Sequence, residues 1–183
     1  MNGLSTPEAV AELRHELRTP LNLIIGYGEM LLEDAEAAGR RAMLERTLAA
    51  GRDLLSLINA AVPPSRGEIS AEEFEALRDS LREPHGRILA ATSELLTPGP
   101  EGADPEFDRD VRRVRGAAER LMTVELPHGG GASRIAFTVE HPTSDGAAAH
   151  PAVQPATILV VDDQEDNRAV LDRRLRRQGH TVE

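Results

Sequence analysis

The chain contains no cysteine and no tryptophan, and its aromatic side chains are limited to one tyrosine and three phenylalanines. The absence of cysteine excludes disulfides, thiolate metal ligands and cysteine nucleophiles. A core with so few aromatics must be built from Leu, Ala, Ile and Val, which favours packed helices over a β-sandwich. No apolar run approaches the ~20 residues of a membrane span, and no signal peptide precedes the first predicted helix. No membrane association is therefore expected.

Positive charge is also in deficit, because 31 acidic residues outnumber 21 basic ones and give a formal net charge of −10 at pH 7 over 183 residues. Such a chain is poorly suited to non-specific attraction to nucleic acid or anionic lipid. Its length fits one or two domains and is sufficient to bury a core. Because Met1 stands directly before the first predicted helix, no sensor domain is expected upstream. A soluble cytoplasmic protein is expected.

Residues 1–64 are predicted to form two antiparallel helices. Ser5 and Glu8 make a capping box, and Thr6-Pro7 offers an alternative cap one residue later. The first helix should run to about residue 38 and be broken by Gly39, and the second should end at Pro63-Pro64. On each helix the apolar residues recur at spacings of three and four, which gives each a packing stripe. The stripes are Val10, Leu13, Leu17, Leu21, Ile24, Gly28 and Leu31 on the first helix, and Leu44, Leu48, Gly51, Leu55, Ile58 and Val62 on the second.

One short segment of the first helix carries candidate chemistry. At about 100° per residue, His15, Thr19 and Asn22 lie nearly opposite the packing stripe, with Glu16 at the flank of the same solvent-facing sector. An imidazole on a rigid helix beside a carboxylate can act as a nucleophile, with the carboxylate polarising one ring nitrogen while the other attacks. An exposed helix histidine without a role is the simpler reading, and the surrounding motif decides between the two.

That motif, His15-Glu16-Leu17-Arg18-Thr19-Pro20-Leu21 followed by Ile24-Ile25-Gly26, resembles the phospho-acceptor box of bacterial sensor histidine kinases. In that family the box lies in the dimerisation and histidine phosphotransfer (DHp) domain. The resemblance implies that His15 carries a phosphoryl group, that Glu16 assists its transfer and that Thr19 positions water for dephosphorylation. It also implies a helix bend at Pro20.

Residues 65–127 repeat the pattern. A shift of 64 positions sets Leu17 on Leu81, Pro20 on Pro84 and Ile24 on Ile88, and two more caps, Ser70 with Glu73 and Asp104-Pro105, precede the third and fourth predicted helices. The copy differs at the candidate chemistry, because Asp79, Ser80 and Glu83 replace His15, Glu16 and Thr19. His85 aligns with core-facing Leu21, so a partly buried, hydrogen-bonded histidine is expected there. The pattern predicts a degenerate second DHp-like hairpin that completes a four-helix bundle.

Residues 128–155 are rich in Gly, Ala, Pro and Ser and are predicted to be a flexible linker, with one short strand-like alternation at 134–140. Residues 156–183 begin with a buried-strand pattern, Thr157 to Asp163, and continue with an amphipathic helix from Asn167 to Gln178 that Gly179 closes. This stretch resembles the start of a response-regulator receiver domain of α/β flavodoxin-like fold. It is too short for a complete receiver, so a truncated receiver start is expected.

Paired carboxylates after a parallel strand suit a hard cation such as Mg²⁺. By the resemblance, Asp162 and Asp163 are the magnesium ligands if the receiver is complete. A simple acidic start to a loop is the alternative reading of the pair.

Three hypotheses follow for function. The favoured one is a two-component phosphorelay signalling protein whose His15 exchanges phosphoryl groups with a histidine kinase or a receiver in trans. The alternative is a non-catalytic dimerisation or docking module for such a partner, and the third is a kinase whose ATP domain lies beyond residue 183. Pairing of hairpins within one chain is slightly favoured over a homodimer.

We predict that the purified chain, given Mg²⁺ and labelled ATP, does not phosphorylate itself. The physical reason is that the sequence has no Asn-x-x-x-Asn helix and no Asp-x-Gly-x-Gly pattern, the boxes that bind nucleotide in kinases of this family. Gly129-Gly130-Gly131 has no phosphate-binding helix after it. Acid-labile label on the isolated chain would contradict this prediction.

Overall fold

The structure, a computed structural model, describes residues 6–35, 38–97, 104–126, 155–162 and 165–183. Within these ranges the chain is mainly helical, as expected. Almost all of the predicted linker, including the strand-like segment 134–140, lies outside the described residues. The elements in chain order are α1 (Pro7–Asp34), α2 (Ala38–Ala61), α3 (Ala71–Leu95), α4 (Pro105–Leu121), β1 (Thr157–Ile158), α5 (Glu165–Arg177) and β2 (Thr181–Val182).

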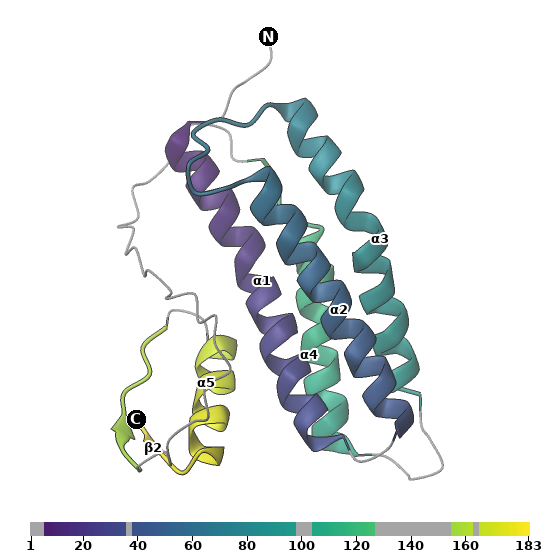
Figure 1. The fold of residues 1–183 in the computed structure, drawn as a ribbon, viewed down its shortest axis with the longest axis vertical. Helices are drawn as coiled ribbons and strands as arrows, with labels where there is room; N and C mark the ends of the chain where they lie inside the picture. The colour runs from purple at the N-terminus through teal and green to yellow at the C-terminus, as the bar shows by residue number, and fades with distance from the viewer. Residues whose placement is uncertain (1–5, 36–37, 98–103, 127–154, 163–164) are drawn as a thin grey trace, which may run out of the picture.

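The first four helices form a bundle that closes within one chain (Figure 1). Helix α1 packs beside α2 and α4, and α3 packs beside the same two helices. Helices α1 and α3 therefore occupy opposite corners of the bundle, and each contains an internal proline, Pro20 and Pro84, that is buried. Two hairpins in this arrangement bury the apolar stripes that either hairpin alone would leave open to water.

The helix starts follow from their capping residues. Ser70 and Glu73 form the predicted capping box of α3, in which each side chain binds the backbone N–H of the other residue. The Asp104 carboxylate accepts from the backbone N–H of Phe107 at the start of α4. For α1, the alternative cap is the one present, because the Thr6 hydroxyl accepts from the N–H of Ala9 at 3.3 Å. Each cap satisfies a donor that the first helical turn leaves without a partner.

The end of α1 differs from the prediction. The helix stops at Asp34, and Gly39, expected to break it, lies inside α2. Ala35 is buried in the core cluster, and its carbonyl accepts from the Arg41 guanidinium at 3.2 Å. Helix α1 thus ends where an arginine of the next helix satisfies the carbonyl of a small buried residue, and no glycine is required.

The core is aliphatic and lies along the axis of the bundle. All seven predicted stripe residues of α1 are buried, as are most of those on α2. Helices α1 and α2 approach closely at Gly28, where an added Cβ would lie 2.8 Å from Leu48 Cδ2. The glycine is therefore required by space at this crossing.

Helix α5 is flanked by the two short strands, which pair in parallel with Thr157 opposite Thr181 and Ile158 opposite Val182. The prediction of a buried strand that extends to Asp163 is wrong in both length and burial. Strand β1 ends at Ile158, and Leu159 and Val161 are 70% and 82% exposed. In the described residues only two strands form the sheet, so no neighbouring layer covers these side chains. A flavodoxin-like start is consequently not supported beyond the β1–α5–β2 connection.

No helix among the described residues is long and apolar enough to cross a membrane.

A pair of glycine substitutions tests the α1–α2 crossing. Gly28→Ala is expected to lower the free energy of unfolding by about 1–3 kcal/mol, because its Cβ would overlap buried Leu48. Gly86→Ala, on the exposed face of α3, is the matched control. It is expected to raise the free energy of unfolding by about 0.5–1 kcal/mol, because a Cβ at this position meets no atom within 4 Å and alanine favours helix. Urea unfolding of the full chain measures both changes. Equal stabilisation by the two variants would contradict the close approach.

Candidate functional site

Helix α1 presents His15 to solvent as its phase predicts. His15 and Glu16 are exposed, Thr19 is half-buried, and Leu13 and Leu17 on the opposite side are buried. The burial of the stripe fixes the rotation of the helix about its axis, and this rotation in turn directs the imidazole outward. The ring is thus available to a partner without any unfolding of the bundle.

The three predicted site residues are neighbours but do not form a hydrogen-bonded triad. No hydrogen bond joins the side chains of His15 and Glu16, which agrees with the 100° angle between adjacent helical positions. The Thr19 hydroxyl donates to the backbone carbonyl of His15 at 3.0 Å. The hydroxyl hydrogen of Thr19 is therefore used locally, and in this arrangement it is not directed at a water near the ring.

Two arginines join the His15 segment to the end of the second helix. The Arg18 guanidinium donates to Asn59 Oδ1 at 2.6 Å, and Arg14 donates to the Pro63 carbonyl at 3.2 Å. These contacts join the helical turns on either side of His15 to α2 and to the segment just after it. Sequence reasoning missed them because they join residues 41 and 49 positions apart, and no local pattern marks such pairs.

His85 lies half-buried in α3, as its alignment with Leu21 predicts. The expected hydrogen bond is absent at one nitrogen, because Nε2 is buried and has no hydrogen-bond partner. Burial lowers the pKa of His85, and the backbone of Ala118 and the carboxylate of Glu119 oppose this effect in part. A buried nitrogen without a partner makes this histidine a source of instability, and its position away from solvent does not suit a phosphoryl acceptor.

The acidic pair after β1 is described at one of its two residues. The Asp162 carboxylate accepts from Asn167 Nδ2 at 3.2 Å, and its backbone carbonyl accepts from Arg168 at 2.6 Å. Asp163 lies outside the described residues. Among the described residues no group of three His, Asp or Glu side chains is placed to bind a metal ion. Asp162 alone offers one oxygen ligand of the kind Mg²⁺ prefers, so the magnesium site stays a prediction.

A charged network between α1, α4 and α5 is the main feature that the sequence did not reveal. The Asp110 side chain on α4 is 3% exposed and binds Arg113 at 3.2 Å and Arg173 of α5 at 2.7 Å. Arg113 also donates to the Tyr27 hydroxyl at 2.9 Å. A cavity of about 480 Å³ adjoins this network, lined in part by Tyr27, Arg113 and Arg173. Asp110 is thus a buried charge on α4, and Arg173 of α5 is one of its partners.

Comparison with known proteins finds a similarity for the N-terminal hairpin. Residues 8–66 match the family model of the His Kinase A (phospho-acceptor) domain, and this range contains His15, Glu16 and Thr19. This part of the chain is therefore similar to HisKA phospho-acceptor domains.

The curated relatives are histidine kinases. The chain is 37% identical over 89 residues to "Sensor histidine kinase AruS" of Pseudomonas aeruginosa, a stretch that covers 49% of this chain and 8% of that protein. It is 28% identical over 85 residues to "Probable histidine kinase 5" of Oryza sativa subsp. japonica, which covers 46% of this chain and 7% of the relative. The chain thus spans less than a tenth of either relative. No solved structure matches it.

We predict that His85→Leu stabilises the bundle and weakens its pH dependence. Because the pKa of His85 is lowered in the folded state, the unfolded chain binds a proton more readily, and stability falls as the pH drops below about 6.5. Leucine, the residue at the aligned position 21, removes both this effect and the buried nitrogen without a partner. The free energy of unfolding should rise by about 1 kcal/mol at neutral pH, and by more at about pH 5.5. Parallel urea titrations at the two pH values measure the difference, and identical pH dependence in both proteins would contradict the prediction.

Proposed function

We propose that this chain is a two-component phosphotransfer protein in which His15 accepts and donates a phosphoryl group. The observation that supports the proposal is the outward position of His15 on a rigid helix inside the range matched to a HisKA phospho-acceptor domain. The curated relatives named as histidine kinases support the same class of signalling. Arg18 binds α2 and Arg14 binds the segment just after it, and these contacts hold this part of α1 in place for an incoming donor.

The chemistry requires little rearrangement of the bundle. A ring nitrogen of His15 attacks the phosphorus of a donor, the nitrogen–phosphorus bond forms, and the bond from phosphorus to the leaving oxygen breaks. Glu16 takes up or orients the proton of the other ring nitrogen, which requires a side-chain rotation because the two groups are not hydrogen-bonded in this structure. The donor is a histidine kinase or a phosphorylated receiver that acts in trans.

The second hairpin is proposed to be a degenerate copy that supplies packing and no acceptor. Its support is positional, because α1 and α3 lie at opposite corners of the bundle and place Pro20 and Pro84 at buried positions. At the aligned acceptor position, exposed Asp79 is paired with Arg82 at 3.1 Å. Helix α3 thus keeps the packing face and presents salt-bridged side chains where α1 presents His15.

Residues 156–183 are proposed to be the start of a receiver domain. The parallel pairing of β1 and β2 on either side of α5 is the connection expected at such a start. Asp162 and Asp163 are the residues that would hold Mg²⁺, which in a receiver neutralises charge during phosphoryl transfer. Coupling between this unit and His15 is part of the proposal.

A labelling experiment tests the role of His15. We expect a histidine kinase or a phosphorylated receiver from the source organism to label the full chain, and His15→Ala to reduce the label to background. The label should be acid-labile, as expected of a nitrogen–phosphorus bond. Circular dichroism should show unchanged helix content, because His15 is exposed and packs against nothing in the core.

Two further variants separate this role from general damage. His85→Ala removes a histidine from α3 and should leave labelling intact. Glu16→Gln should slow transfer by about 100-fold, the range typical of a lost proton-transfer group, with helix content preserved. Failure of every kinase and phosphorylated receiver to label the wild type above the His15→Ala background would overturn the proposal and favour a non-catalytic docking module.

A further inference from the structure

Helix α5 lies beside the C-terminal half of α1 (Figure 1). At 100° per residue, the α1 residues on the same side as His15 fall within a sector about 80° wide. We call this sector the His15 stripe, and it consists of His15, Thr19, Asn22, Gly26, Glu29 and Glu33. Contacts from α5 begin at Gly26 and continue to the end of α1, so they occupy the lower part of the stripe and leave His15 uncovered.

An apolar contact marks the upper end of the interface. Val170 of α5 is 9% exposed and belongs to the core cluster of the bundle. A Cβ built on Gly26 would lie 3.0 Å from Val170 Cγ1. The glycine therefore permits the two helices to approach closely, and a larger side chain would separate them.

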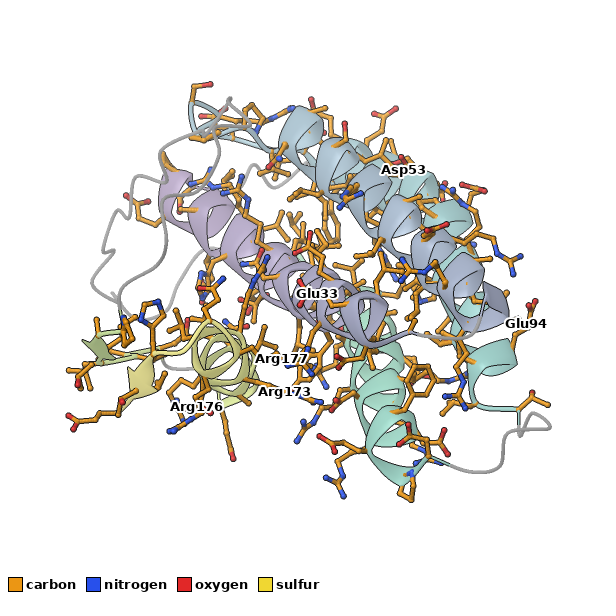
Figure 2. All side chains as sticks on the ribbon, turned by 60° about the horizontal axis from the view of Figure 1, so that its bottom comes forward. Glu33, Asp53, Glu94, Arg173, Arg176 and Arg177 are labelled. Atoms are coloured by element: carbon orange, nitrogen blue, oxygen red, sulfur yellow. The ribbon has the colours of Figure 1, made fainter. Side chains whose placement is uncertain are left out.

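Arginines of α5 pair with carboxylates along the rest of the interface. Arg174 binds Glu29 at 3.2 Å, and Arg177 binds Asp34 and lies 3.9 Å from Glu33. Figure 2 shows Arg173 and Arg177 on the side of α5 that faces the bundle and Arg176 on another side. Arg176 instead pairs with Asp172 of its own helix.

The buried carboxylate of Asp110 makes the interface specific. Its Oδ1 pairs with Arg113 of the same helix, and its Oδ2 lies 2.7 Å from Nη1 of Arg173. A carboxylate that is 3% exposed requires partners for its charge, and α5 provides one of them. Arg173 also pairs with Glu106 at 3.0 Å, so one arginine joins α5 to two carboxylates of α4.

We propose that the part of the His15 stripe from Gly26 to Glu33, together with Asp34 and Asp110, is a docking surface for a basic helix, and that α5 of the same chain is its occupant in solution. The acidic face of α1 and α4 matches Arg173, Arg174 and Arg177 in charge and position. The successive contacts of Val170, Arg174 and Arg177 descend α1 in order, so α5 runs parallel to α1. The docking stands independently of whether His15 is phosphorylated.

A charge-reversal cycle at Glu29 and Arg174 tests the docking in the full chain. Apart from this interface, the two-stranded sheet is the only support of α5 among the described residues, so its backbone hydrogen exchange reports whether it is docked. Glu29→Arg leaves the sequence of α5 unchanged and should accelerate exchange across residues 165–177 about fivefold. The double variant Glu29→Arg with Arg174→Glu should return exchange close to that of the wild type.

Glu45→Arg on exposed α2 is the control, because it makes the same change of charge on a helix that α5 does not contact. It should leave exchange in α5 unchanged. Glu29 also accepts from Arg52 of α2 at 3.4 Å, so exchange of α2 is followed in the same samples to separate that effect. Raising the salt from about 50 mM to about 1 M should accelerate α5 exchange in the wild type.

Two outcomes would overturn the proposal. In one, α5 exchanges equally fast in the wild type and in Glu29→Arg, or the double variant exchanges as fast as the single variant. In the other, exchange in α5 rises on about tenfold dilution of the wild type, which would show that a second copy supplies the docked helix. Neither outcome involves phosphoryl label, so a failed docking is distinguishable from a failed phosphotransfer function.

Discussion

Burial of one aliphatic stripe on each helix of the bundle is the constraint on which the rest of the structure depends. On α1 the stripe runs from Val10 to Leu31, and its burial fixes the rotation of the helix. The same rotation places His15 in solvent and directs Glu29 and Glu33 toward arginines of α5. Packing of the core and exposure of His15 are therefore set by one interaction, because the side chains of a helix keep fixed angles to one another.

Local features of the fold were predictable because their causes are local. The capping box of Ser70 and Glu73 and the cap at Asp104 lie within four residues of the helices that they begin. The end of α1 was predicted at the wrong residue, because glycine is only one way to end a helix and here Arg41 satisfies the Ala35 carbonyl. The exposed Leu159 and Val161 show the other limit, since an apolar run indicates a buried strand only where another layer covers it.

In the candidate site, too, features with local causes were predictable and features that depend on helix packing were not. Exposure of His15 follows from helical phase, and the half-buried position of His85 follows from its alignment with Leu21. The hydrogen bond from Thr19 to the His15 carbonyl competes with the role expected from the family resemblance, and spacing alone does not distinguish the two. The pairs Arg18–Asn59 and Asp110–Arg173 join residues 41 and 63 positions apart, so they depend on how the helices assemble.

Closure of the bundle by a single chain has a consequence for stoichiometry. Two identical hairpins related by a two-fold axis would present two equivalent acceptors, and whatever happened at one face would be available at the other. Here α1 carries His15, whereas the aligned position on α3 is Asp79 in a salt bridge with Arg82. Each folded molecule thus presents one face with His15 and one face without it, and substitutions on α3 alter the second face while the first keeps its own sequence.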